Sequence, residues 1–500
     1  MTDQPATGAL GGPLPGSLDP AATAGADGAG ALDAGFRGMP LGGWAWALFQ
    51  GGRDPYVILI SIYIFAPYFS AVVVGDPIKG QSLVATMTTI QGLIAALTAP
   101  FLGAAIERFG ARKPILLAIV AMMVPLVAAL WFVTPGSGGI PVGLTLWIFG
   151  LIGVLFVYGE VIHNSMLIGA AGPTHAPHAS GLALSAGNAF SVLTLIFCMI
   201  AFALPGQVDW SFIPAKPLFG LDPAKFEPSR IVAPIAACLM AVLAIPMFLF
   251  TPDVARSGER FLTSLRRGTG GLWETVKSLK GETDMRNYLL ARMLFTDGMT
   301  SLLAFGGLYA AGVMKWQVLE MLGYGILLSI FAVVGGFVGS ALDRMIGPRK
   351  AVQIAIAGAI VCVVAQLGMG RETILYFWTY DPATAAPLWN GPMFRTLPEA
   401  IYLLIGFGVA IFVVAHYASS RTLLTRLSLP EKLPAFFGLY AMSGTATVWI
   451  GSLLVGLFTA VFHSQQAGFI PIAGLLGLGL IGMFFVRGGG KDQWRSQGLV

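Results

Sequence analysis

The residues best able to do chemistry here are a few ionisable and polar side chains inside long apolar runs. Glu160, His163 and Asn164 follow one another at spacings of three and four, which places them on one helix face. A glutamate and a histidine on one face could carry a proton, or the three could form a hydrogen-bond cluster that only holds helices together. Because ionisable groups are costly inside a bilayer, we favour a function facing a central cavity.

A second pair, Arg292 and Asp297, lies in another apolar run. Arg292 is about one turn into that run and Asp297 is deeper. We expect Asp297 to be the best single candidate for a proton or substrate site. The alternative is that Arg292 forms a structural ion pair with a carboxylate.

Two further polar features are less specific. His416 and Tyr417 lie in an apolar run next to Ser419, Ser420 and Arg421, and could face the Glu160 cluster or form a satisfied internal group. A glutamine in a membrane helix is most often a link between helices, and Gln91 is therefore a weaker candidate for substrate contact.

Arg53 and Asp54 precede the first strongly apolar run, with Gly51 and Gly52 before them and Pro55 after. Proline suits the first turn of a helix, and an aspartate can cap it. The sequence therefore predicts a helix that begins at Asp54, with Arg53 reaching the membrane edge. The alternative is that Arg53 faces a vestibule and binds a carboxylate or an anionic substrate.

Composition sets the environment of these residues. The chain has 500 residues, of which 56% are hydrophobic and only 11% charged, whereas about a quarter of a soluble domain is charged. Runs of about 20 apolar residues recur, and each could cross a bilayer as a helix. The three cysteines lie in such runs, where buried free thiols are expected. We find no metal-binding, cofactor-binding, catalytic or nucleic-acid-binding motif, and predict an all-α membrane protein that is not an enzyme.

Twelve candidate spans form two sets of six. They cover approximately residues 54–75, 83–106, 114–134, 142–168, 180–205, 230–251, 288–312, 318–342, 351–370, 399–426, 435–461 and 468–487. The predicted organisation is a disordered tail (1–42), an N-terminal half (43–251), a linker with amphipathic helices (252–286), a C-terminal half (287–487) and a short tail (488–500). Lysines and arginines gather on the side of the tails, which predicts cytoplasmic termini in a cell membrane protein.

The two halves carry matching loops. GAAIERFGARK (103–113) follows the second span, and GSALDRMIGPRK (339–350) follows the eighth. Duplicated helical halves with substrate bound between them are typical of secondary transporters. We expect these loops to latch one conformation, or else only to anchor the membrane edge. Their candidate residues are Gly103, Glu107, Arg108, Arg112, Gly339, Asp343, Arg344 and Arg349.

This loop pattern resembles the signature of the major facilitator superfamily. IFAPYFS (64–70), HNSML (163–167), SGLALSAGN (180–188), SRTLLTRLSLP (420–430) and FFGLYAMSGTAT (436–447) further resemble the vacuolar amino-acid effluxer family and its bacterial relatives. The resemblance implies a twelve-helix permease of two pseudo-symmetric six-helix halves, in bacteria at the inner membrane. The chain departs from the family pattern at residues 50–55 and at Thr445.

We therefore expect a secondary transporter that moves a small polar solute by alternating access, as a monomer among membrane lipids and without a cofactor. Protons are the coupling ion we favour, with Asp297 or Glu160 as the carrier. The alternatives are an uncoupled facilitator, an exporter of lipids or hydrophobic drugs, and a non-transporting membrane sensor.

Overall fold

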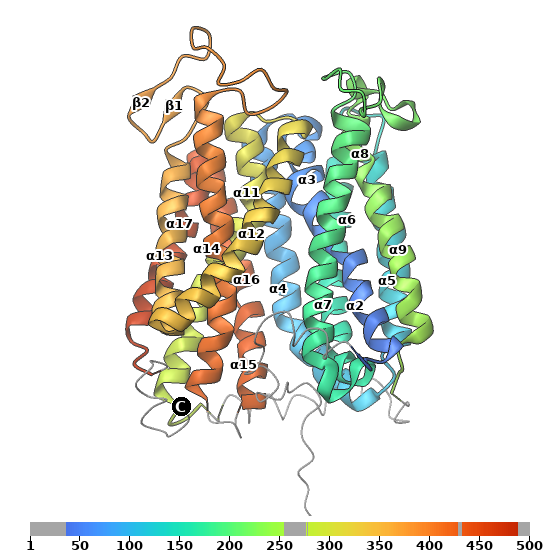
Figure 1. The fold of residues 1–500 in the computed structure, drawn as a ribbon, viewed down its shortest axis with the longest axis vertical. Coiled ribbons are helices and arrows are strands. Elements are labelled where there is room, and N and C mark those ends of the chain that lie inside the picture. Colours follow the sequence, from blue (N-terminus) through green and yellow to red (C-terminus); the bar gives the residue numbers. More distant parts are fainter. Residues whose placement is uncertain (1–36, 255–276, 278, 429–432, 489–500) are drawn as a thin grey trace, which may run out of the picture.

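The computed structural model describes residues 37–254, 277, 279–428 and 433–488 (Figure 1). The proposed disordered tail, most of the amphipathic linker and the C-terminal tail lie outside these residues. The described part is a bundle of long helices with one small hairpin, which confirms the predicted all-α membrane class.

The first half of the chain forms one set of helices. They are α2 (Leu41–Pro55), η2 (Tyr56–Tyr63), α3 (Phe65–Tyr68), η3 (Phe69–Val73), α4 (Pro77–Phe109), α5 (Lys113–Ala129), η4 (Leu130–Phe132), α6 (Val142–Ser165), α7 (Leu167–Cys198), η5 (Met199–Ala203), η6 (Leu218–Gly220), η7 (Pro223–Lys225), α8 (Glu227–Arg230) and α9 (Val232–Phe250). The elements η2, η3 and η5 are π-helical.

The second half repeats the arrangement. It contains α11 (Thr283–Met314), α12 (Val318–Ile346), α13 (Pro348–Leu367), β1 (Thr373–Ile374), β2 (Trp378–Thr379), α14 (Leu397–Leu427), α15 (Leu433–Thr445), α16 (Val448–Phe462) and α17 (Gln465–Phe484). The two strands pair antiparallel, with Thr373 opposite Thr379.

Local signals explain several helix boundaries. Asp76 caps α4, because its carboxylate accepts the N–H groups of Ile78 (2.8 Å) and Lys79 (3.2 Å). Thr396 and Glu399 form a capping box at the start of α14. Gly347, with φ +86°, gives the turn between α12 and α13 a conformation that few other residues adopt.

Within the described residues, eleven helices are long and apolar enough to cross a membrane. α11, with 32 residues, matches them in length but carries Arg292 and Asp297 and is less apolar. It packs against α14, α15, α16 and α17 and against the other half, so its polar groups contact protein rather than lipid. The count of twelve spans stays a prediction.

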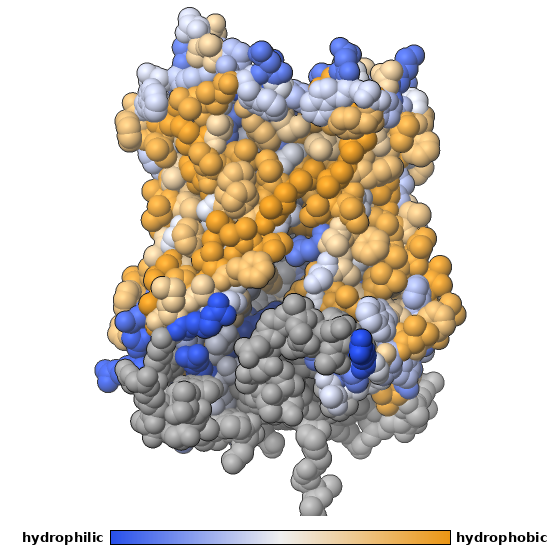
Figure 2. Space-filling model, in the orientation of Figure 1, coloured by the Kyte–Doolittle hydropathy of each residue, from blue (hydrophilic) through white to orange (hydrophobic). Residues whose placement is uncertain are grey.

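We call the end of the bundle where α2 begins and α17 ends the terminal face, and the end with β1 and β2 the hairpin face (Figure 1). Between them the surface is an apolar belt, with polar residues at both ends (Figure 2). Leu97, Leu193, Phe337 and Leu404 are among its exposed members. Such a belt matches the hydrocarbon region of a bilayer.

The halves meet along two helix pairs. α4 packs against α16 on one side of the molecule, and α7 packs against α12 on the other. α11 also contacts η2 and α3 of the first half. This seam between the halves positions the candidate residues.

Candidate functional site

Arg53 is at the centre of a polar cluster in the first half. It lies 12 residues from the start of α2, about 18 Å along the helix, so its backbone is near the middle of the bundle. The side chain is 4% exposed. Its guanidinium donates to the carbonyl of Phe156 (3.1 Å) and lies over the Phe156 ring, with Cζ 4.2 Å from the ring centroid.

A carboxylate of α6 completes this cluster. Glu160 Oε2 is 3.8 Å from Arg53 Nη2, and the Glu160 side chain is 51% exposed. Arg53 thus links a buried helix to a carboxylate that is open to a ligand or water. This geometry agrees with the expectation that Arg53 binds a carboxylate.

Asp54 belongs to the same cluster. Its Oδ1 accepts from the Gln50 amide at 2.6 Å, and Gln50 Oε1 in turn accepts from Arg53 at 3.3 Å. The Asp54 carboxylate lies against Gly187 of α7, where a Cβ would overlap it. The small residue lets a charged side chain fit between two closely packed helices.

The predicted start of the first span at Asp54 is wrong. The span runs over Leu41–Val73, and Pro55 lies inside it rather than in its first turn. Asp54 is therefore not an N-cap, and Arg53 does not lie at the membrane edge. Because proline cannot donate a backbone hydrogen bond, the helix changes to the π-helical η2 directly after Pro55.

His163 does not share the exposure of its neighbours. It is fully buried, its ring stacks on Trp46 at 4.3 Å, and Nε2 is 2.9 Å from the Trp46 carbonyl. Trp46 Nε1 donates to the His163 carbonyl at 2.7 Å. Asn164, in contrast, is exposed. The structure therefore separates His163, which joins α6 to α2, from Glu160 and Asn164.

In the second half, Arg292 and Asp297 do not pair with each other. Arg292 donates to the Tyr440 carbonyl and to Ser443 Oγ, both at 2.7 Å, and its Cζ lies 3.5 Å from the Tyr440 ring centroid. Asp297 Oδ2 accepts the backbone N–H of Gly451 at 2.9 Å. The alternative of an Arg292–carboxylate pair does not match these contacts.

His416 and Tyr417 lie on α14 and contact residues of their own half. The His416 ring is fully buried and meets Phe295 edge-on at 4.9 Å. Tyr417 Oη is 3.4 Å from Thr300 Oγ1. These contacts connect α14 with α11 and do not bring His416 to Glu160.

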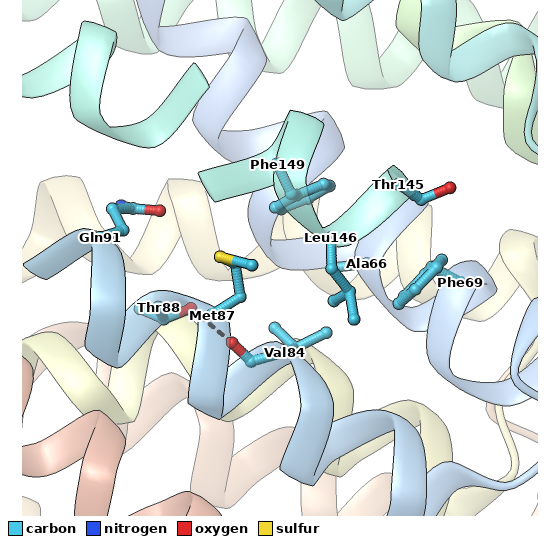
Figure 3. Close-up of a pocket in the computed structure, with 9 residues that line it drawn as sticks. All are labelled: Ala66, Phe69, Val84, Met87, Thr88, Gln91, Thr145, Leu146 and Phe149. Atoms are coloured by element: carbon cyan, nitrogen blue, oxygen red, sulfur yellow. Dashed lines mark hydrogen bonds between the residues drawn. The ribbon is translucent and has the colours of Figure 1, made fainter. Parts of the chain in front are cut away.

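Gln91 lines a small pocket between α3, α4 and α6 (Figure 3). Its amide lies over Gly153 of α6, where a Cβ would overlap it. The pocket is otherwise mostly apolar, with Met87, Leu146 and Phe149 in its wall. Gln91 therefore packs within its own half, as the interpretation of a link between helices predicts.

The two matching loops are fixed in related ways. The carboxylate of Asp253, after α9, accepts the backbone N–H groups of Arg112 (3.0 Å) and Lys113 (3.1 Å). In the second half, Arg349 donates to the carbonyls of Val486 (2.9 Å) and Arg487 (3.2 Å) after α17. Each loop is thus joined to the end of the last helix of its own half.

The remaining loop candidates have separate positions. Gly103 faces Val161 of α6, and Gly339 lies against the Ala415 backbone of α14. Asp343 is buried and interacts with Ser419 and Thr422 of α14, whereas Arg344 is exposed. The side chains of Glu107 and Arg108 are outside the described part of the chain, so the latch stays a prediction.

A hydrogen-bonded lock crosses the seam at residues that no sequence pattern had indicated. Gln81 of α4 and Gln465 of α17 are both buried. Gln465 Nε2 donates to Gln81 Oε1 at 3.0 Å, and Gln81 Nε2 donates to Thr459 Oγ1 at 2.8 Å. The only signal in the sequence was the presence of two glutamines at helix starts, which is too common to be specific.

Two glycines bring the halves into close contact near this lock. At Gly307 of α11 a Cβ would overlap the carbonyl of Ile62, and at Gly325 of α12 it would lie 3.0 Å from the Tyr63 ring. Tyr63 also meets Tyr324 edge-on at 5.9 Å. All these contacts lie toward the hairpin face, so the halves are sealed at that end.

A cavity of about 220 Å³ lies outside this seal, between the halves. Tyr63, Tyr68, Phe226 and Trp316 contribute to its walls. Its polar members are Ser229, Lys315 and Gln317. Its position makes it a vestibule on the hairpin face.

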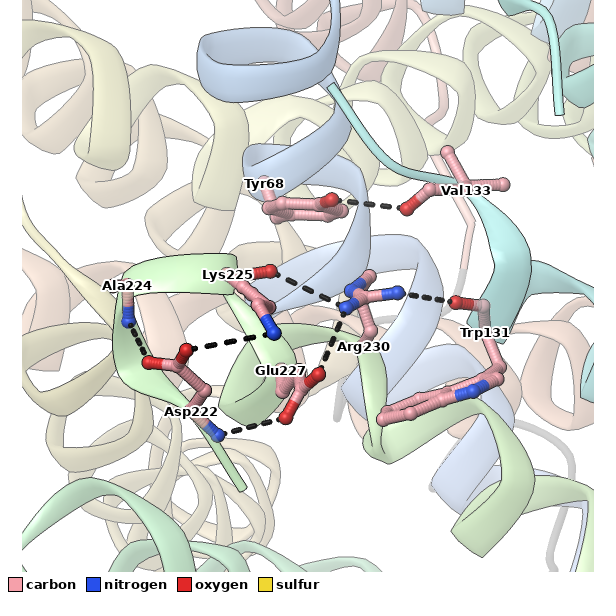
Figure 4. A network of polar contacts seen from close by, with 8 residues as sticks. All are labelled: Tyr68, Trp131, Val133, Asp222, Ala224, Lys225, Glu227 and Arg230. Atoms are coloured by element: carbon pink, nitrogen blue, oxygen red, sulfur yellow. Dashed lines mark hydrogen bonds and ion pairs between the residues drawn. The ribbon is translucent and has the colours of Figure 1, made fainter. Parts of the chain in front are cut away.

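The hairpin-face end of the first half is held by Arg230 (Figure 4). Its guanidinium donates to the carbonyl of Trp131 (2.9 Å) and lies 3.6 Å from Glu227 Oε1. Tyr68 of the first span donates to the carbonyl of Val133 at 2.9 Å. The Arg230 contact holds α8 against the end of the third span, and the Tyr68 contact joins the first span to the segment after the third. Across the described residues, no group of three or more His, Cys, Asp or Glu side chains could hold a metal ion.

Solved transporter structures share this architecture. A point mutant of the nucleoside transporter NupG matches with a TM-score of 0.60 at 13% identity, over 89% of this chain and 100% of its own. A D-xylose–proton symporter matches with 0.55 at 15%, over 91% and 97%. The inward-open xylose transporter XylE from E. coli matches with 0.55 at 15%, over 91% and 98%. At such identities these likenesses establish the fold alone.

Sequence comparison gives the family. No curated protein matches the chain significantly. The family described as "Vacuole effluxer Atg22 like" matches residues 177–491, which is more than half of the chain. The families to which this chain is homologous are transporters rather than enzymes. The chain is therefore a multi-pass membrane transporter of the major facilitator type and belongs to the Atg22-like vacuole effluxer family.

Proposed function

We propose that this protein is a secondary active transporter that moves a small polar solute across the cell membrane by alternating access, coupled to protons through the Arg53–Glu160 cluster. The observation that carries the proposal is the half-exposed Glu160 carboxylate, 3.8 Å from the buried guanidinium of Arg53. A charged pair inside a membrane bundle is costly to keep, and such pairs commonly mark ion or substrate pathways.

The direction of access supports this proposal. The seal at Gln81, Gln465 and Gly307 lies toward the hairpin face, whereas Glu160 is near the terminal-face end of α6 and is exposed. In Figure 2 polar residues interrupt the apolar belt where the halves part, in the lower part of the view. The excess of lysine and arginine near the terminal face supports a cytoplasmic position for that face.

Charge favours a proton or an amine-bearing solute at this site. The cluster contains two carboxylates, Asp54 and Glu160, and one guanidinium, Arg53. With both carboxylates ionised it has one negative charge in excess. A proton, or the ammonium group of an amino acid or related metabolite, would neutralise it. Asp297 is a weaker carrier, because it is buried and accepts a backbone N–H.

The test is gradient-driven transport in proteoliposomes. A thermal stability screen against amino acids, short peptides, organic acids and sugars first supplies the test solute, since a ligand that binds the folded state stabilises it. Glu160→Gln is expected to keep exchange of labelled solute but to lose accumulation driven by a pH gradient. The matched control is Glu372→Gln, at an exposed carboxylate in the loop after α13.

Undiminished gradient-driven accumulation in Glu160→Gln would overturn coupling through this residue. Solute that only equilibrates in the wild type, with or without a pH gradient, would identify an uncoupled facilitator in which the carboxylates are structural.

A further inference from the structure

The eleventh span is interrupted in a way that its sequence does not explain. One apolar stretch, Phe436–Phe462, crosses the bundle, but it consists of α15 and α16 with Ala446 and Thr447 non-helical between them. There is no proline at the break. Instead, the neighbouring helix α11 contacts the last turns of α15 and the first turn of α16.

Arg292 lies beside the last turns of α15. Its guanidinium donates to the Tyr440 carbonyl, five residues before the helix ends, and to Ser443 Oγ in the last turn, and it lies over the Tyr440 ring. The C-terminal end of a helix carries partial negative charge. A cation in the last turns of α15 therefore favours a helix that ends there.

Asp297 binds the start of α16. Gly451, in the first turn of α16, would normally donate its N–H to Thr447 in an unbroken helix. It donates to Asp297 Oδ2 at 2.9 Å instead, and the Thr447 carbonyl accepts from Ile450 at 2.8 Å. Thr447 Oγ1 donates to the Met293 carbonyl of α11 at 2.9 Å. A carboxylate at a helix N-terminus is the favourable sign of charge.

The spacing on α11 fits the break. Asp297 follows Arg292 by five positions, which is about 7.5 Å along a helix. Gly444 and Gly451, the residues of span 11 beside these side chains, have no Cβ that would obstruct them. One helix thus presents a cation to the end of α15 and an anion to the start of α16.

Both half-helices contact α4 and α11, but α16 packs against α4 far more extensively than α15 does. α16 contacts α4 across the seam, where Ser82 Oγ donates to the Gly456 carbonyl at 3.4 Å and Gln81 reaches Thr459 at 2.8 Å. α15 lies at the terminal-face end, outside that seal (Figure 1). The break therefore separates a segment fixed in the seal from one at the open end.

We propose that Arg292 and Asp297 are positioning residues that hold span 11 as two separately capped half-helices, so that residues 446–447 form a hinge on which α15 moves relative to α16 during transport. Asp297 acts here as a hydrogen-bond acceptor and cap. An asparagine can accept the same N–H, but an alanine cannot.

Hydrogen–deuterium exchange of the purified protein tests the hinge without a known substrate. In Asp297→Ala, amides in residues 446–451 should exchange about fivefold faster than in wild type, the effect of losing a helix cap. Asp297→Asn should exchange like wild type and should keep gradient-driven transport. Arg292→Met should raise exchange at the end of α15, and Arg292→Lys should restore part of the protection.

A second variant keeps the proposal testable if Asp297→Ala does not fold. Thr447→Val removes only the hydrogen bond to Met293 and should also raise exchange in residues 446–451. Wild-type exchange in Thr447→Val and in any folded Asp297→Ala would overturn the proposal. So would loss of gradient-driven transport in Asp297→Asn with unchanged exchange, because it would make Asp297 a proton carrier rather than a cap. The exchange outcome is independent of the role proposed for Glu160, whereas the transport outcome requires a wild type that accumulates solute in a pH gradient.

Discussion

At the scale of residues, the predicted polar side chains fall into those that are open to solvent and those that are enclosed by neighbouring helices. Glu160 is open and lies beside Arg53, whereas His163 is enclosed by Trp46 and Phe49. Helical spacing places Glu160 and His163 on the same side of α6, but it does not say how far the neighbouring helix covers that side. That depends on the large rings of α2, which only the packed structure reveals.

We predict that His163 stabilises the fold rather than carrying a proton. His163→Ala should lower the free energy of unfolding by about 2–4 kcal/mol, because it removes a packed ring and leaves the Trp46 carbonyl without its partner. Thermal unfolding of the detergent-solubilised protein, followed by tryptophan fluorescence, measures this change. Asn164→Ala is the control, since Asn164 is exposed and its loss should cost little. Equal stability of the two variants would contradict the assignment.

At the scale of elements, hydrophobic runs located most spans, but local signals misplaced the first. Arg53, Asp54 and Pro55 looked like a helix start because proline and aspartate favour that position. In the bundle, Leu41–Pro55 is helical, since α7 and α9 pack along it and Arg53 finds partners on α6. These tertiary contacts therefore outweigh the local preference of Asp54 and Pro55 for a helix start. No sequence pattern within the segment predicts the contacts.

The break in span 11 was also out of reach of sequence reasoning. FFGLYAMSGTAT was informative about the family, but the interruption at residues 446–447 depends on Asp297 and Arg292, about 150 residues earlier in the chain. The sequence shows those two residues as charges in an apolar run, but it does not show which residues they contact.

Close approach between α11 and η2 gives a prediction for one glycine. Gly307→Ala should weaken the seal at the hairpin face, because the added methyl group would overlap the Ile62 carbonyl. A cysteine placed at Tyr63 should then react faster with a membrane-impermeant thiol reagent added from that face. Gly306→Ala is the matched control, since no atom lies within 4 Å of a Cβ there. Identical labelling of the two variants would show that this contact does not close the seam.

At the scale of the whole molecule, low charge, the paired loops and the two sets of spans were enough to predict two helical halves with a substrate path between them. The state of that path was not predictable, because it depends on side chains that meet only when the halves dock. Gln81 and Gln465 are ordinary residues in the sequence, but in the structure Gln465 donates to Gln81 and Gln81 donates to Thr459, which closes the seam. Both are accommodated by glycines, Gly312 against Gln465 and Gly468 against Gln81.

The central claim is that the two halves open and close about this seam, and a distance measurement tests it most directly. Spin labels at Gly143→Cys on α6 and Arg395→Cys before α14, both exposed, report the separation of the halves at the hairpin face. The native Cys198, Cys238 and Cys362 would first be replaced by serine.

Gln81→Leu removes the 3.0 Å partner of Gln465 Nε2 and leaves it only the Pro77 carbonyl at 3.4 Å. This loss costs about 1–3 kcal/mol and applies only while the seam is closed. We predict a second, longer distance population in Gln81→Leu, and its reversal in Gln81→Leu with Gln465→Leu, where no buried amide is left without a partner. One unchanged distance distribution in wild type and both variants would contradict the account.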